Sequence, residues 1–159
     1  MVVFHIKFSK KRAIVLAGCL VLVVALGLLL GGCFHKKANE NGISATGVST
    51  NEDRIAYLLQ YGWQVKPDPV ESMELMLPDP LSDAYQAYDK LQQDQGFTLS
   101  DYCGKQVTRY TYAVTNYPHA PDGVQANLYI CGSTVIAGDI ICLGENGFQV
   151  GLAFPADKS

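Results

Sequence analysis

Few residues of this chain have the type and spacing that acid–base or nucleophilic catalysis requires. Asp139 lies in the β-rich run 137–140, where an acid is either a buried functional group or one that faces solvent or pairs with Arg109. His119 is the one histidine beyond residue 50, and no nucleophile with a neighbouring base is evident. The sequence also lacks a Gly-x-Ser-x-Gly elbow, a phosphate-binding glycine loop and an evident carboxylate pair. We therefore expect a non-enzymatic protein, with a small cell-envelope hydrolase using Asp139 and a tyrosine or His119 as the alternative.

The cysteines are candidates for disulfide, metal or lipid chemistry. Cys131 and Cys142 are candidates for a disulfide if their strands curl, although a two-residue turn would place Cys131 opposite Thr134. The alternative is that they are small buried hydrophobic residues. No Cys-x-x-Cys spacing occurs, so we predict no metal site and no cofactor. The five cysteines are Cys19, Cys33, Cys103, Cys131 and Cys142.

Aromatic and polar residues of the segment 105–117 form a candidate binding groove. Tyrosine serves both in cores that need a polar tip and on recognition surfaces, so an exposed row of this kind would bind a peptide or a glycan. The alternative is that these aromatic residues pack in the core. The groove residues are Arg109, Tyr110, Tyr112, Asn116 and Tyr117, with Asp139 as a further member.

Two helices are expected to support these residues. Ser49 and Glu52, and Thr50 and Asp53, both have the spacing of a capping box, which predicts a helix over about 51–61. Its expected apolar residues are Ile55, Leu58 and Leu59. A second helix begins at the candidate cap Ser82 and ends at Gly96, with Leu81, Tyr85, Tyr88 and Leu91 on one face.

The rest of the domain is dense in β-branched and aromatic residues. Residues 63–77 alternate but contain Pro67 and Pro69, which is typical of a broken or edge strand. Strands are expected over 105–116, 125–131, 134–141 and 147–154, with a hairpin turn at 132–133. This order predicts an α+β fold in which two helices pack on one face of a mainly antiparallel sheet, preceded by one N-terminal transmembrane helix.

The N-terminal third predicts a membrane-tethered protein. A basic segment (1–12) precedes an apolar segment (13–32), whose twenty residues span about 30 Å as a helix, the thickness of a bilayer core. Four basic residues precede the span and two follow it closely, which favours a cytoplasmic N-terminus. We therefore expect a single-pass protein of the cell membrane, with a flexible tether (33–50) and an extracytoplasmic domain (51–159).

A lipoprotein is the alternative form of this anchor. Residues 29–33 read Leu-Leu-Gly-Gly-Cys, which resembles a bacterial lipobox in which Cys33 would be lipidated. The apolar segment is longer than the core of a typical secretory signal peptide, which favours the uncleaved anchor. Both forms leave the domain tethered outside the membrane.

The charge of the outer part limits its partners. From Ala38 onward, six basic residues face fifteen acidic ones, a net charge of −9. Such a domain repels phosphate backbones, so we expect no nucleic-acid partner. Expected partners are the membrane, through the N-terminal helix, and an envelope protein or peptide.

Several linked segments resemble a known family. They are residues 51–58, 61–65, 104–112 and 116–118, followed by 135–140 and 147–148. Together these are similar to an uncharacterised bacterial membrane-anchored family, domain of unknown function 4830. The resemblance implies a short single-pass protein and no particular mechanism. The chain departs from the family pattern at Cys103, Cys131 and 141–142, so any role of these thiols would belong to this protein alone.

The sequence thus predicts a tethered, extracytoplasmic module for binding or interaction. The ligand would be a protein, a peptide or an envelope component. A structural or inhibitory module is a further class, which predicts a tight partner and no small-molecule pocket.

Overall fold

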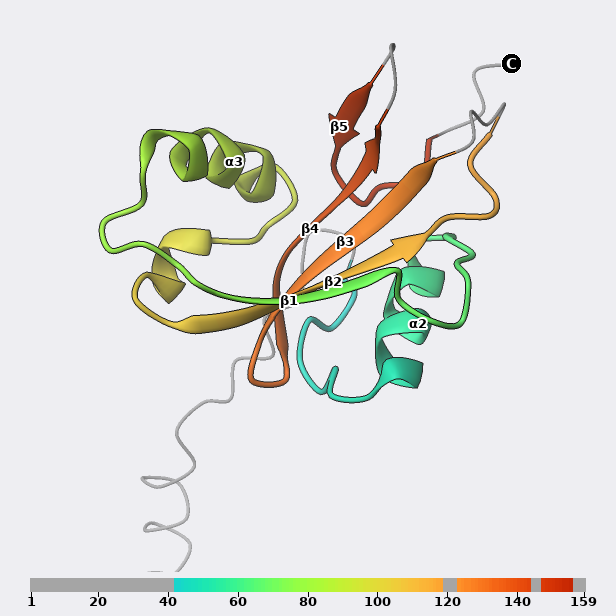
Figure 1. The fold of residues 1–159 in the computed structure, drawn as a ribbon, viewed down its shortest axis with the longest axis horizontal. Helices are drawn as coiled ribbons and strands as arrows, with labels where there is room; N and C mark the ends of the chain where they lie inside the picture. The colour runs from blue at the N-terminus through green and yellow to red at the C-terminus, as the bar shows by residue number, and fades with distance from the viewer. Residues whose placement is uncertain (1–41, 119–122, 144–146, 156–159) are drawn as a thin grey trace, which may run out of the picture. The chain divides into compact units, whose positions relative to one another are not determined.

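The computed structural model describes residues 42–118, 123–143 and 147–155, which form a five-stranded antiparallel sheet with two α-helices (Figure 1). The predicted α+β class is therefore confirmed. The strands follow the order β1-β2-β3-β4-β5 across the sheet. The elements in chain order are α2 (Asn51–Gln60), β1 (Glu71–Met76), α3 (Asp83–Gln93), the short 3₁₀ helix η1 (Leu99–Tyr102), β2 (Gln106–Ala113), β3 (Val124–Cys131), β4 (Thr134–Cys142) and β5 (Phe148–Val150).

The predicted N-terminal segments 1–12 and 13–32 lie outside the described residues, as do residues 33–41 of the predicted tether. Within the ranges that the structure describes, no helix has the length and apolar character needed to cross a bilayer.

The two helices pack on opposite faces of the sheet, so the expectation that both cover one face is wrong. Arg54 of α2 donates a hydrogen bond to Tyr112 of β2, whereas Tyr88 of α3 donates one to Asp139 of β4. The register across β3 places Asp139 in line with Thr111. Because Thr111 and Tyr112 are consecutive in a strand, their side chains point to opposite faces. The chain passes from one face to the other at the edge strand β1 (Figure 1).

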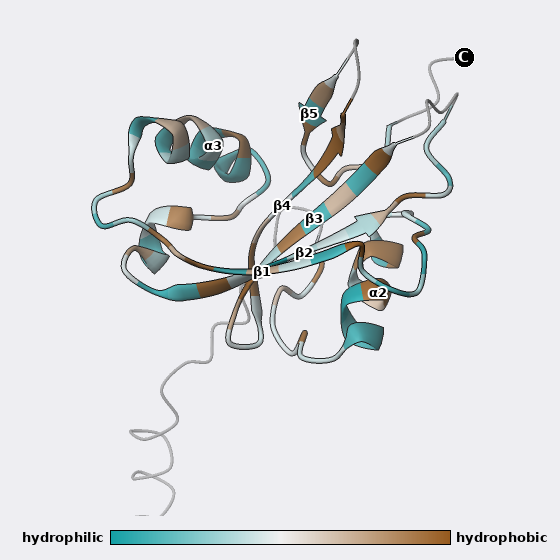
Figure 2. Ribbon diagram, in the orientation of Figure 1, coloured by the Kyte–Doolittle hydropathy of each residue, from teal (hydrophilic) through white to brown (hydrophobic). Residues whose placement is uncertain are grey.

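The face under α2, called the α2 face, carries the larger hydrophobic core. Tyr57 and Leu58 of α2 pack with Leu128 of β3 and Ile140 of β4. Hydrophobic residues recur along β3 and β4 (Figure 2), and Val135, Ile140 and Cys142 of β4 belong to this core. Trp63 is buried in the same core and donates a hydrogen bond from Nε1 to the carbonyl of Leu152 at 2.7 Å. This core fixes α2 against the middle of the sheet.

The opposite face, called the α3 face, has a smaller apolar core beside a row of buried polar groups. Leu99, Val107 and Ile136 form part of the core, against which Tyr88 packs. A register irregularity at 129–130 brings Ile136 to this face beside Ala137. Asp139, Asn127 and Thr111 continue the same face as polar residues.

The start of α2 follows the predicted capping box of Thr50 and Asp53. The Thr50 side chain accepts a hydrogen bond from the Asp53 amide, and the Asp53 side chain accepts one from the Thr50 amide. The buried face differs from the expected one, because Arg54, Tyr57 and Leu58 are buried whereas Leu59 is exposed.

Residues 42–50 are part of the folded domain, so the expectation of a flexible tether does not hold for them. Thr46 forms a β-bridge with Thr134, and the amides of Gly47 and Val48 both donate to the carbonyl of Ser133. Ala45 and Val48 are buried in the α2-face core. Small residues such as Ala45 bury little apolar area themselves. The β3–β4 hairpin orders this segment because it supplies both hydrogen bonds and apolar contact.

Candidate functional site

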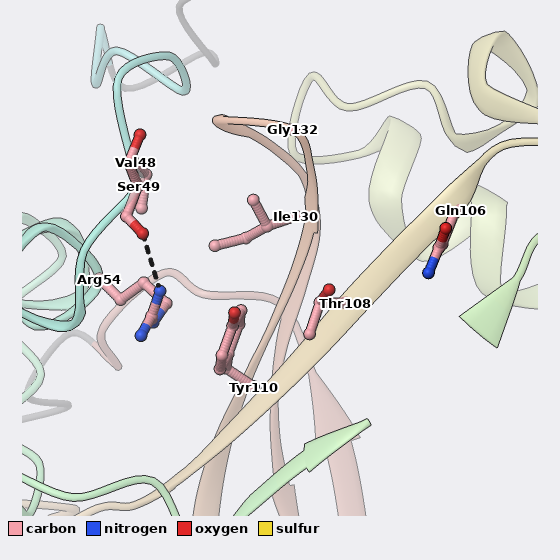
Figure 3. Close-up of a pocket in the computed structure, with 8 residues that line it drawn as sticks. All are labelled: Val48, Ser49, Arg54, Gln106, Thr108, Tyr110, Ile130 and Gly132. Atoms are coloured by element: carbon pink, nitrogen blue, oxygen red, sulfur yellow. Dashed lines mark hydrogen bonds between the residues drawn. The ribbon is translucent and has the colours of Figure 1, made fainter. Parts of the chain in front are cut away.

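A polar pocket lies on the α2 face, where residues 48–49 and α2 meet the outer half of β2 and the β3–β4 hairpin. Its volume is ≈ 290 Å³. Figure 3 shows that Arg54 and Tyr110 lie against one another on one side, with Thr108 and Ile130 across from them. The lining residues are Val48, Ser49, Arg54, Gln106, Thr108, Tyr110, Ile130 and Gly132.

Arg54 is the one charged residue among those that line this pocket. Its side chain is 9% exposed, and its guanidinium carbon lies 3.8 Å from the centre of the Tyr110 ring. Nε donates to the Tyr112 hydroxyl at 2.8 Å, and Nη1 donates to the Ser49 carbonyl at 3.3 Å. These acceptors are neutral, and within the described part of the chain no carboxylate forms an ion pair with Arg54. The pocket therefore contains a buried cation that forms no ion pair with a described residue, although its charge helps to lower the pKa of the adjacent Asp53.

The hydrogen bonds behind Arg54 fix its orientation. Tyr112 accepts from Arg54 and donates its own hydroxyl proton to Asn51 Oδ1 at 2.8 Å. Asn51 in turn donates from Nδ2 to the carbonyl of Pro67 at 2.8 Å. Burial raises the pKa of Tyr112, although the hydrogen bond from Arg54 opposes this effect. Tyr112 therefore stays a neutral hydroxyl that holds the guanidinium in place.

Helical periodicity explains why an arginine lies here. Arg54, Tyr57, Leu58 and Tyr61 are spaced i, i+3, i+4 and i+7, so they share the face of α2 that meets the sheet. A basic residue near the start of a helix is also unfavourable for the helix dipole. The sequence analysis did not single out Arg54, but its place in the apolar repeat and in the first turns of the helix was a usable signal.

The neutral lining residues come from segments that the sequence does not connect. Ser49 and Thr108 offer hydroxyl groups, while Val48 and Ile130 offer apolar walls. Gln106 lies at the start of β2, away from the other lining residues (Figure 3), and donates from Nε2 to Glu74 of β1 at 2.9 Å. No local motif marks these residues, because the docking of 42–50 against the hairpin brings them together.

The predicted groove residues on β2 do not form one surface. Tyr110 lines the pocket, and Tyr112 is buried behind it as the partner of Arg54. Arg109 points to the α3 face, where it forms an ion pair with Glu71 of β1. The strand alternation separates Arg109 from its two tyrosine neighbours.

Asn116 and Tyr117 have structural contacts away from the pocket. Asn116 accepts from the Gln64 amide and donates to the Gly62 carbonyl, both at 2.8 Å. The Tyr117 ring stacks on Trp63 with the ring centres 5.8 Å apart. These two residues hold the chain that follows α2 against the end of β2.

Asp139 is enclosed on the α3 face, so the expectation that it faces solvent is wrong. Within the described residues it forms no ion pair with Arg109, which pairs with Glu71 instead, although the Arg109 charge still acts on it. It is 0% exposed and accepts hydrogen bonds from Tyr88 at 2.6 Å, Asn127 at 2.8 Å and Gln149 at 3.2 Å. Burial raises its pKa above the ordinary value of 3.8, although the three hydrogen bonds and the charge of Arg109 oppose this effect. An enclosed carboxylate surrounded by neutral donors is suited to joining elements rather than to meeting a substrate.

The predicted disulfide is not formed, since Cys131 and Cys142 are both free. Cys131 is the register partner of Thr134, whereas Cys142 is that of Val124 at the other end of β4. Strand geometry separates these ends by about 25 Å, far beyond the reach of a disulfide. Cys33 and His119 lie outside the described residues.

The fold and the pocket define a small α+β domain with one arginine-based polar site. A family model described as a domain of unknown function (DUF4830) matches residues 57–140, more than half of the 159 residues. The chain belongs to this family, as the sequence resemblance indicated. No curated protein and no solved structure matches the chain. The matched region contains the β2 and β3 walls of the pocket and begins just after Arg54.

Proposed function

We propose that this protein is a membrane-tethered, extracytoplasmic binding module without enzymatic activity. Its ligand is part of a protein, a peptide or another envelope component, and it binds in the Arg54 pocket. The tether and its orientation rest on the basic and apolar segments 1–12 and 13–32.

The observation that carries this proposal is that Arg54 is buried beside a pocket and has neutral hydrogen-bond acceptors. A guanidinium removed from water costs free energy unless an opposite charge or a full set of acceptors replaces the water. Arg54 has two neutral acceptors and a ring among the described residues, and the rest of it borders a pocket. This arrangement is suited to a binding site that is completed by its ligand.

The hydrolase alternative has no comparable support. Its candidate acid, Asp139, is enclosed, and His119 lies outside the described residues. The lipoprotein alternative concerns only the anchor, because lipidation at Cys33 would leave the same domain at the same membrane surface.

Capture of partners by the full-length protein in native membranes tests the binding function. Thr108→Trp fills the pocket, whereas Gln125→Trp adds the same side chain to β3 on the α3 face. We expect a partner that crosslinks to the wild type and to Gln125→Trp but not to Thr108→Trp. Equal capture by all three proteins would contradict the proposal.

The intact mass and membrane fractionation of the same protein test the anchor. A full-length mass in the membrane fraction, with protease reaching only the C-terminal domain, is the expected result. A mass that begins at a lipidated Cys33 would replace the helix by a lipid anchor. A soluble, shortened product would contradict tethering.

A further inference from the structure

The charge of the Arg54 pocket matches that of a single carboxylate. Among the residues that line the pocket, Arg54 is the one charged group, and the others are neutral polar or apolar residues. We infer that the pocket binds the singly charged carboxylate at the C-terminal end of a partner polypeptide. This inference rests on the proposed binding function and names the chemistry of its ligand.

The guanidinium keeps N–H groups that have no acceptor among the described residues. Of its five N–H groups, the one on Nε and one on Nη1 donate to Tyr112 and Ser49. Tyr110 covers one face of the group. One N–H on Nη1 and both on Nη2 have no acceptor among the described residues. Two parallel N–H groups match the two oxygens of a carboxylate.

The surroundings favour one negative charge over two. A phosphate monoester carries about −1.5 to −2 at neutral pH, so one arginine would leave part of its charge unpaired in a partly buried site. The outer part of the chain has a net charge of −9, from six basic and fifteen acidic residues, which further disfavours multiply charged ligands. A carboxylate is neutralised by Arg54 alone.

The size of the pocket favours one residue of a larger partner. Sites for whole small molecules range from about 300 to 1,000 Å³, and this pocket of ≈ 290 Å³ lies at the lower limit. The hydroxyls of Ser49 and Thr108 are further donors for a carboxylate, while Val48 and Ile130 provide apolar contact for the carbon chain that bears it. The C-terminal residue of a polypeptide has both the carboxylate and the short carbon chain that these groups would contact.

A matched pair of probes tests the inference on the full-length protein in detergent micelles. N-acetyl-Ala-Ala has a free carboxylate, and its C-terminal amide has the same shape without the charge. Binding is followed by the NMR shift of the Arg54 Nε–H and by the binding isotherm. We expect saturable binding of the acid, with the amide and inorganic phosphate each about tenfold weaker or more.

Three variants separate binding from folding. Arg54→Gln should reduce binding of the acid at least about tenfold, and Arg54→Lys should reduce it less, because lysine keeps the charge but not the planar fork. Arg109→Gln is the matched control on the α3 face and should bind like the wild type. The thermal unfolding midpoint of each variant shows whether it is folded.

Several binding results would contradict the proposal of a carboxylate site. Equal binding of acid and amide, tighter binding of phosphate, or unchanged binding by folded Arg54→Gln would each contradict a carboxylate site. Absence of binding by every probe would contradict it as well. In those cases, loss of partner capture by Thr108→Trp would still support the binding function, so the two proposals fail separately.

Discussion

The two faces of the sheet each bury a charged group, but they surround it differently. On the α3 face, Asp139 is fully enclosed and accepts hydrogen bonds from donors on α3, β3 and β5. On the α2 face, Arg54 has neutral acceptors on one side and a pocket on the other. A charge enclosed by neutral donors stabilises a junction between elements, whereas a charge left open to a pocket is available to a ligand.

The comparison assigns different roles to residues that look alike in the sequence. Arg109 lies in the tyrosine-rich strand β2 and Arg54 packs against that strand, yet Arg109 has Glu71 as its partner. Arg54 instead lies over the ring of Tyr110. Neutralisation by a nearby carboxylate, rather than residue type, separates the structural cation from the candidate binding group.

The apolar cores of the two faces differ most strongly in their expected contribution to stability. Ile140 is 0% exposed in the larger α2-face core, and Ile136 is 2% exposed in the smaller α3-face core. We expect Ile140→Ala to lower the free energy of unfolding by about 4 kcal/mol and Ile136→Ala by about 2 kcal/mol. Chemical denaturation of the two variants measures this difference. A larger loss in Ile136→Ala would reverse the ranking of the two cores.

The next largest loss of unfolding free energy is expected from substitution of Asp139. Asp139→Ala leaves the donors of Tyr88 and Asn127 without their acceptor in a buried site, at a cost of about 3 kcal/mol in unfolding free energy. Denaturant titration provides the measurement. A change below about 0.5 kcal/mol would show that water replaces the carboxylate and that this face is not closed.

The pH dependence of stability, compared between the wild type and the Asp139→Asn variant, is a further test of the burial of Asp139. The pKa of Asp139 in the folded protein is raised above 3.8, so the ionised form is disfavoured by folding. Its contribution to stability is complete below about pH 3.8 and is lost as the pH rises through the folded pKa. The stability of the wild type relative to Asp139→Asn should therefore fall as the pH is raised from 3.8. An unchanged difference across this range would contradict the shift.

Local sequence patterns predicted the main helices and strands, but they did not predict which face of the sheet each helix covers. The capping box at Thr50 and Asp53 and the hairpin at 132–133 are local signals, and both are present in the structure. Which face each helix covers depends on strand register and on the crossing at β1, and neither is encoded in a local pattern. The same limit explains the error at 42–50, whose hydrogen bonds are to Ser133 and its neighbours.

Of the residues that line the Arg54 pocket, the sequence analysis named Tyr110 as a binding residue but missed Arg54 itself. Tyr110 was identified from strand alternation, because a period of two is visible in the sequence. Arg54 was missed because the apolar repeat of the helix was assigned to Ile55, Leu58 and Leu59, of which only Leu58 belongs to the buried face formed with Arg54 and Tyr57. Thr108 and Ile130 join the site through tertiary packing, for which a single sequence contains no signal.

The caps of the two helices provide a smaller, matched test. Thr50 caps α2 with its side chain, whereas Ser82 makes no side-chain hydrogen bond at the start of α3. We expect Thr50→Ala to lower the unfolding free energy by about 1 kcal/mol and Ser82→Ala to leave it nearly unchanged. Thermal unfolding of both variants gives the comparison. Equal effects would mean that the side-chain hydrogen bond of Thr50 adds no stability beyond that of a helix start without one.

A small effect on the unfolding free energy is also expected at Arg54. Arg54→Met keeps much of the side-chain volume and removes the cost of burying a charge, which offsets the hydrogen bonds lost to Tyr112 and Ser49. The unfolding free energy should therefore change by less than about 1 kcal/mol, against about 3 kcal/mol for Asp139→Ala. Denaturant titration of the two variants under the same conditions measures both values. A loss of similar size in Arg54→Met would make Arg54 a structural cation like Arg109, whereas a stable variant that no longer binds carboxylate would separate its role from that of Asp139.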